Sequence, residues 1–228
     1  MKKYFIFVLL FLMQGMVFAE DNIALEKVKI NLRDKQSIAR GAKFFAANCM
    51  ACHTLIYLRY NKVARDAGIT YEKMPIHVTA WPFGITPPDL SLTANSRGVD
   101  WIYTYLHSFY VDPQRPTGFN NLLIPNTAMS GILVVYQGRQ VLATDLKNSR
   151  LVFGRQLQWY DELELQSSGT MTPQEFDATI TDVVNFLAYA AEPYHNERVR
   201  IGYWVIGFLF ILFVLTYFLK KEYWKDIF

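Results

Sequence analysis

The sequence predicts a mainly α fold, in which one domain of helices and long loops is followed by a single C-terminal transmembrane helix. Two stretches with helical periodicity, at 34–53 and 171–195, are the first observation. The second is an uncharged run at 202–219, which is long enough to cross a membrane. The third is the segment 74–155, whose Pro, Gly, Asn and Tyr residues show little periodicity and indicate loops.

The N-terminus has the three parts of an export signal. Lys2 and Lys3 precede an apolar run at 4–13, and small residues ending at Ala19 offer a cleavage site. The run is shorter than the roughly 20 residues that a membrane span needs. We therefore expect residues 1–19 to be a signal peptide, the alternative being an uncleaved anchor.

The first periodic stretch is a helix that leads into the only two cysteines of the chain. Apolar residues recur at helical spacing from Ile38 through Phe45, and Ser37 is the expected N-cap. Cys49, Cys52 and His53 follow within the same stretch, so the helix presents all three chemically active side chains at its end.

Two cysteines separated by two residues suit a redox disulfide, half of a zinc site, or thioether attachment of haem. A histidine directly after the second cysteine favours haem, because two sulfurs can reach the vinyl groups of one porphyrin edge while the imidazole binds the iron. A redox pair would follow a strand, and a zinc site needs four ligands. The other histidines are scattered: His77, His107 and His195. The motif predicts one haem c, bound covalently through Cys49 and Cys52 with His53 as an iron ligand.

The loop-rich middle of the chain fits this interpretation. Long loops in a compact domain usually bind a ligand, and an apolar macrocycle would supply core that the loops lack. We therefore expect a single c-type cytochrome domain with long haem-wrapping loops, interrupted by a helical segment at 99–110.

The sixth coordination position of the iron could be left open or filled by a second side chain. Six side chains are candidates: Met74, Met129, Met171, His77, His107 and His195. Met129 lies in the loop "LIPNTAMSGIL", from which a thioether could reach the opposite haem face. Methionines in loops also fill gaps in packing, so the residues alone leave this choice open.

The last helix of the domain has clear boundaries. Thr172, Pro173 and Glu175 form an expected cap, first-turn proline and capping box, and Glu192-Pro193 ends the run. Its apolar stripe predicts packing against the helix that enters the haem motif.

The uncharged run 202–219 predicts the membrane anchor, and the lysines that follow favour the cytoplasm. We expect a periplasmic haem-c domain at 20–200, a transmembrane helix at 201–219 and a cytoplasmic tail at 220–228. Residues 20–200 contain 18 Lys and Arg and 18 Asp and Glu, so no nucleic-acid partner is predicted.

Several stretches together resemble the cytochrome c1 family, whose members are the haem-c subunits of cytochrome bc1 (quinol–cytochrome c reductase) complexes. These stretches are "CMACHTLIYLRY", "PPDLSLTANSRGVDWIYTYL", "PTGFNNLLIPNTAM", "NFLAYAAEPYHNERVRIGYWV" and "LKKEYWKDIF". The resemblance implies His53 and Met129 as axial ligands, Pro88 packed by the haem, and Arg97 near a haem propionate.

The resemblance also implies a function and partners. It implies an electron-transfer subunit in the bacterial inner membrane, without a catalytic site of its own, that passes electrons from the Rieske iron–sulfur protein to a c-type cytochrome acceptor. Cytochrome b and a dimeric complex are further implied. The alternatives are a membrane-anchored haem sensor with an open iron and a generic c-type cytochrome that serves another oxidase.

Overall fold

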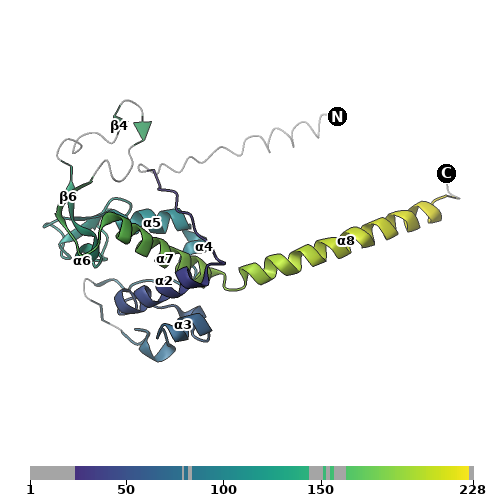
Figure 1. Cartoon of the computed structure of the whole chain (residues 1–228), viewed down its shortest axis with the longest axis horizontal. Helices are drawn as coiled ribbons and strands as arrows, with labels where there is room; N and C mark the ends of the chain where they lie inside the picture. The colour runs from purple at the N-terminus through teal and green to yellow at the C-terminus, as the bar shows by residue number, and fades with distance from the viewer. Residues whose placement is uncertain are drawn as a thin grey trace.

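The computed structural model describes residues 24–78, 80–81, 84–143, 151–152, 155–156 and 163–225, so the expected signal peptide lies outside the described residues. The mainly α class is confirmed (Figure 1). The helices are α2 (Lys35–Asn48), α3 (Lys62–Asp66), α4 (Thr93–Ser96), α5 (Val99–His107), α6 (Val134–Gln137), α7 (Pro173–Ala191) and α8 (His195–Tyr223), with 3-10 turns η1 (Ile56–Leu58) and η2 (Tyr71–Lys73).

The predicted contact between the two long helices of the domain is confirmed, because α2 and α7 pack along each other (Figure 1). Phe45 of α2 meets Phe186 of α7 with ring centroids 5.8 Å apart. Gly41 permits the close approach, since a Cβ at this position would lie 2.9 Å from the Cβ of Phe186. At the edge, Arg40 donates two hydrogen bonds to the Asp182 carboxylate, of 2.6 and 2.9 Å.

The two long helices begin differently from one another. The predicted capping box of α7 is confirmed: Thr172 accepts from the Glu175 amide, and the Glu175 carboxylate accepts from the Thr172 amide. The expected cap of α2 was wrong, because Asp34 fills that position and its carboxylate accepts from the amides of Gln36 and Ser37. Ser37 is buried in the first turn, where its hydroxyl accepts from Asn185 of α7 at 2.8 Å.

Helix α7 is the centre of the core. It contacts α4 and α5 on one side and α2 on the other. Its buried side chains are Phe176, Ile180, Val183, Val184, Asn185, Phe186, Leu187, Ala188 and Ala190. His107, which closes α5, is 1% exposed and stacks edge-on against Phe176 of this helix. Helix α7 therefore joins α2, which precedes the loop-rich middle, to α4 and α5 within it.

The loop-rich middle contains short strands that the sequence did not predict. They form three two-stranded antiparallel sheets: β1 (Phe109–Val111) with β2 (Phe119–Asn121), β3 (Gly138–Leu142) with β6 (Leu163–Ser168), and β4 (Leu151–Val152) with β5 (Arg155–Gln156). Most of these strands are too short to show alternation in the sequence.

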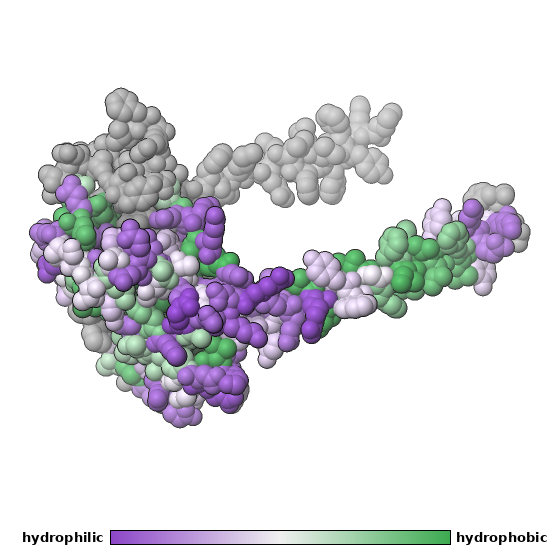
Figure 2. All heavy atoms as spheres, in the orientation of Figure 1, coloured by the Kyte–Doolittle hydropathy of each residue, from purple (hydrophilic) through white to green (hydrophobic). Residues whose placement is uncertain are grey.

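Helix α8 leaves the domain as one long rod (Figure 1). It is long and apolar enough to cross a membrane, and its apolar side chains project outward without cover from the described residues. Figure 2 shows hydrophilic residues where α8 leaves the domain and a hydrophobic band farther along it. The helix extends the expected span 201–219 in both directions.

Candidate haem site

The two cysteines lie in a tight turn that continues directly from α2. The Cys49 amide donates to the Phe45 carbonyl at 2.8 Å, which extends the helical pattern by one residue. The amides of Cys52 and His53 then both donate to the Cys49 carbonyl, at 3.1 and 2.8 Å. These bonds place the two thiols and the imidazole within a single compact turn. Both thiols are free of disulfide bonds, with Cys49 half-buried and Cys52 exposed.

The His53 ring is oriented by a backbone carbonyl. Its Nδ1 lies 2.8 Å from the carbonyl oxygen of Pro88, and the residue is only 9% exposed. A carbonyl accepts and cannot donate, so Nδ1 carries a proton and Nε2 of the neutral ring has its lone pair free. Metal-binding histidines are commonly held in this way, because the bond to the distal nitrogen fixes both tautomer and orientation.

Burial also favours the neutral imidazole. Desolvation lowers the pKa of His53, and this effect outweighs the opposing bond to Pro88 and the charge of Asp89. A neutral ring is the form that binds a metal ion.

Asp89 fastens the Pro88 loop to the segment that follows His53. Its Oδ2 accepts from the Thr54 hydroxyl at 2.6 Å and from the Ile56 amide at 2.9 Å, while its Oδ1 accepts from the Ser91 amide at 2.9 Å. Burial alone would raise the pKa of Asp89, but hydrogen bonds led by those from Ser91 and Thr54 outweigh it, so the pKa is lowered. The ionised carboxylate therefore holds the Pro88 carbonyl in place.

The Cys49 thiol does not have the electrostatics of a redox cysteine. Burial, with a smaller contribution from Cys52, raises the pKa of Cys49 to about 12. Thioredoxin-like cysteines have a lowered pKa instead. In the part of the chain that the structure describes, no three His, Cys, Asp or Glu side chains gather as a metal site would require. The haem interpretation of the motif is therefore favoured over both alternatives.

Met129 lies on the β2–α6 loop and is tied to α5. The Tyr105 hydroxyl is 3.7 Å from the Met129 sulfur and 3.0 Å from the Thr127 hydroxyl. The Met129 amide donates to that same Thr127 oxygen at 3.4 Å. The loop is thus anchored at Thr127 and at the methionine itself, and Met129 is half-buried.

Arg97 is exposed at the C-cap of α4, and it begins a row of side chains on one face of α5. Its guanidinium lies over the Trp101 ring, 5.1 Å from the centroid. Trp101 stacks on Tyr105 with centroids 5.0 Å apart and an interplanar angle of 9°. Since Tyr105 contacts Met129, this row links the arginine to the methionine loop.

The predicted site residues fall into two groups. Cys49, Cys52, His53 and Pro88 form the first, joined by the turn after α2 and the bond to the Pro88 carbonyl. Arg97 and Met129 belong to the second, on and beside α5.

Sequence reasoning missed the parts played by Asp89, Thr127 and Tyr105. For Tyr105 a signal was present: positions 101 and 105 are four residues apart in the expected helical segment, which places their side chains on one helix face.

The other ligand candidates have different partners. Met74 is buried in the core, and the Met171 sulfur accepts from the Thr179 hydroxyl at 3.8 Å. His107 is bonded through Nδ1 to the Tyr103 carbonyl and through Nε2 to Asp177. His195 bonds Glu192 at 2.6 Å, next to the start of α8. These four side chains are held elsewhere in the fold, which leaves Met129, half-buried on its loop, and His77, which is exposed.

A Cys-x-x-Cys-His turn at a helix end, with the ring oriented by a carbonyl, defines the class of c-type cytochromes. The Cytochrome C1 family model matches residues 71–227. The chain is 42% identical to cytochrome c1 of Allochromatium vinosum over 223 residues, which is 89% of each protein. The chain belongs to the cytochrome c1 family.

Two further relatives differ in their names. The ammonia monooxygenase gamma subunit of Nitrosomonas europaea is 37% identical over 90% of this chain and 89% of its own length. The mitochondrial cytochrome c1 heme protein of Neurospora crassa is 24% identical over 84% of this chain and 62% of its own length.

Proposed function

We propose that the chain is the electron-transfer subunit of a quinol–cytochrome c reductase complex and holds one haem c covalently through Cys49 and Cys52. The observation that carries the proposal is the orientation of His53. Its Nδ1 is bonded to the Pro88 carbonyl, so Nε2 is available as an iron ligand directly beside the two thiols.

The residues present fit a haem. The turn supplies two free thiols that would form thioether bonds, and His53 would bind the iron. Apolar side chains near both ligand segments are exposed, including Ile85 before Pro88 and Ile132 after Met129. An apolar macrocycle would cover such side chains.

Each residue has a separate task in this proposal. Met129 would bind the iron as its second protein ligand, and a thioether of this kind raises a haem reduction potential. Tyr105 and Thr127 hold its loop, and Arg97 offsets the charge of a haem propionate. When bound, the haem supplies reversible one-electron chemistry. The chain breaks no bond in a substrate and needs no catalytic residue.

Family membership supports the partners and the membrane position that we propose. The haem domain, 20–200, lies in the periplasm of a bacterium, α8 crosses the inner membrane once, and the tail after 219 is cytoplasmic. Residues 1–19 are the export signal. The Rieske iron–sulfur protein delivers the electron, a c-type cytochrome accepts it, and cytochrome b completes a dimeric complex.

Covalent attachment can be tested on the purified full chain. Acid–acetone extraction should leave the haem on the wild-type protein, because thioether bonds survive it. Cys49→Ala and Cys52→Ala should each leave one vinyl group unreacted, which moves the pyridine haemochrome band to longer wavelength. Complete extraction of haem from the wild-type chain would show that the thiols do not hold it.

The second ligand is tested with a matched pair of methionine variants. Met129→Leu should abolish the thioether-to-iron charge-transfer band, lower the reduction potential and allow carbon monoxide to bind. Met171→Leu removes an equal thioether from a side chain that contacts Thr179, and it should keep the band. A wild-type protein that is high-spin and binds carbon monoxide readily would support a haem sensor instead.

The complex is tested by co-purification. A tag on the chain should recover a cytochrome b and a Rieske protein, and the recovered material should reduce a c-type cytochrome with quinol. Recovery of a different oxidase, or of an ammonia monooxygenase, would retain the haem assignment and overturn the proposed complex.

A further inference from the structure

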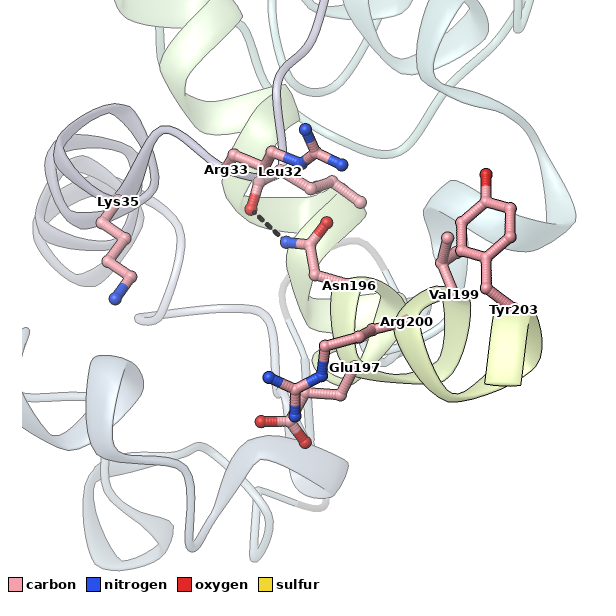
Figure 3. A pocket seen from close by; sticks show the side chains of 8 residues that line it. All are labelled: Leu32, Arg33, Lys35, Asn196, Glu197, Val199, Arg200 and Tyr203. Carbon is pink, nitrogen blue, oxygen red and sulfur yellow. Dashed lines mark hydrogen bonds between the residues drawn. The ribbon is translucent and has the colours of Figure 1, made fainter. Parts of the chain in front are cut away.

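A surface hollow of about 510 Å³ lies where α8 leaves the domain (Figure 3). One wall is the segment that leads into α2, and the other is the first two turns of α8. The lining residues are Leu32, Arg33, Lys35, Asn196, Glu197, Val199, Arg200 and Tyr203. The hollow is distinct from the haem ligands, and nothing in the proposed electron path uses it.

Three cationic side chains line this hollow without a partner. Among the residues that the structure describes, Arg33, Lys35 and Arg200 form no side-chain hydrogen bond or ion pair. Glu197 is the single acid in the lining, so the hollow has a net charge of +2. Figure 3 shows Glu197 and Arg200 about one turn apart on α8, with Lys35 on the other wall. Such a set of cations favours an anionic ligand.

The hollow also straddles a change in polarity along α8. Arg200 precedes the uncharged run 202–219 by two residues, and Tyr203 is the second residue of that run. Tyr203 adds aromatic surface on the membrane side of Arg200, where it is 74% exposed, and Val199 adds apolar surface one residue before the arginine. Figure 2 shows the same change from hydrophilic to hydrophobic residues. A ligand that fits must be anionic at one end and apolar at the other.

The walls of the hollow are held together by hydrogen bonds. The Asn196 side chain on α8 donates to the Leu32 carbonyl at 3.0 Å, as Figure 3 shows. One residue earlier, Asn31 exchanges two hydrogen bonds with Asn185 of α7: its amide donates at 3.2 Å and its carbonyl accepts at 3.1 Å. The site is therefore preformed, so a ligand need not order it.

We propose that this hollow binds the phosphate headgroup of an anionic phospholipid from the leaflet that faces the haem domain. Arg33, Lys35 and Arg200 bind the phosphate, and Val199 and Tyr203 contact the start of the lipid chains. The inference rests on the proposed insertion of α8 in the membrane and is independent of the haem assignment.

The test counts lipids on the full chain in detergent by native mass spectrometry, during titration with phosphatidylglycerol or phosphatidylcholine. A basic residue near an anionic lipid surface contributes about fivefold in affinity. The wild-type chain should bind one phosphatidylglycerol in preference to phosphatidylcholine. The combined variant Arg33→Gln, Lys35→Gln, Arg200→Gln should lose that lipid, with a drop in affinity on the order of a hundredfold.

The matched control removes charge from the far end of the same helix. Lys220→Gln with Lys221→Gln should keep the one selective lipid, and Glu197→Gln should bind it more tightly because the single acid is removed. The Glu197 variant retains the described hydrogen bonds of the hollow, so it tests the site even if the triple variant folds poorly. Inorganic phosphate should not displace the lipid at equal concentration, because it lacks the apolar part.

Three results would overturn the inference. The first is equal binding of phosphatidylglycerol and phosphatidylcholine, and the second is an equal loss of bound phosphatidylglycerol from the triple variant and from the lysine control. The third is displacement of the lipid by inorganic phosphate. Flotation with phosphatidylcholine vesicles distinguishes absence of the headgroup site from absence of membrane insertion by α8. A chain that does not float contradicts the proposed membrane helix, whereas a chain that floats without lipid selectivity contradicts only the headgroup site.

Discussion

Replacing Asp89 with alanine should loosen the loop that orients His53. The change removes three acceptor contacts, to the Thr54 hydroxyl and to the amides of Ile56 and Ser91. Two of these bonds attach the residue after Pro88 to the segment after the haem motif, and the third, from Ser91, lies within the loop itself. Without them, the Pro88 loop is held by the 2.8 Å contact of its carbonyl with His53, by the Leu90 amide, which donates to the Thr54 carbonyl at 2.9 Å, and by the Ser91 hydroxyl, which accepts from the Tyr57 amide at 3.2 Å.

The size of the effect follows from those contacts. A hydrogen bond to a charged group contributes about 1.5–3 kcal/mol to stability when it is shielded from water. Asp89 is exposed, so water replaces part of each bond in the variant and screens the charge. We therefore expect Asp89→Ala to lower the free energy of unfolding by about 2 kcal/mol in total. Asp89→Asn retains an acceptor oxygen and should cost about half as much.

Thermal unfolding of the full chain in detergent, followed by far-ultraviolet circular dichroism, measures this change. For a domain of this size, 2 kcal/mol corresponds to a fall in Tm of about 4–8 °C. Asp66→Ala is the control, because Asp66 makes only an exposed ion pair with Lys62 one turn away and should shift Tm by less than about 2 °C. Equal shifts for the two alanine variants would refute the argument that Asp89 fastens the loop.

Two further substitutions test the α2–α7 contact and the methionine loop. Gly41→Ala should lower the free energy of unfolding by about 1–3 kcal/mol in chemical denaturation, because the added Cβ would overlap the Asp182 carbonyl. This loss should exceed the gain from the higher helix propensity of alanine. An unchanged or increased stability would contradict the close packing of α2 on α7. Tyr105→Phe should weaken the thioether-to-iron band and lower the reduction potential, because it removes the hydroxyl beside the Met129 sulfur. Tyr103→Phe on the same helix is its control, and equal spectral changes in both variants would argue against a specific role for the Tyr105 hydroxyl.

The fold was predictable where local chemistry decides it. The capping box and the Glu192-Pro193 end gave the bounds of α7, because both signals depend on residues within one turn. The cap of α2 was missed because Asp34 and Ser37 are equally good caps by type. Only the burial of Ser37 against Asn185 excludes the serine from that position.

The short strands needed tertiary information. Strand β1 pairs with β2 across a turn, whereas β3 pairs with β6 across the 20 residues between them, with a register shift after Arg139. The three-residue strands β1 and β2 are too short for a periodic signal, and the partners β3 and β6 lie too far apart in the sequence for their pairing to be predicted.

The haem motif was predictable because three neighbouring residues supply the chemistry. Its orientation was not, because the partner of His53 is a backbone carbonyl 35 residues away, and every non-terminal residue has such a group. Tyr105 and Met129 are likewise 24 residues apart. A sequence identifies which side chains can bind a haem, whereas the contacts that aim them depend on how the loops return to the helices.

The position of α7 connects these contacts to the membrane. It holds α2, which leads directly into the turn with the cysteines and His53, and also α5, which carries Tyr105 beside Met129. It then passes into α8 through a short elbow, where Glu192 accepts from His195 and pairs with Arg198. Because Asn196 bonds the segment before α2 as well, the elbow is braced from two directions. In the proposed complex, electrons pass from one protein to another. The rate of transfer therefore depends on the orientation of the haem domain as well as on the reduction potential of the haem. This brace would set that direction relative to the membrane, and a lipid in the adjoining hollow would strengthen it.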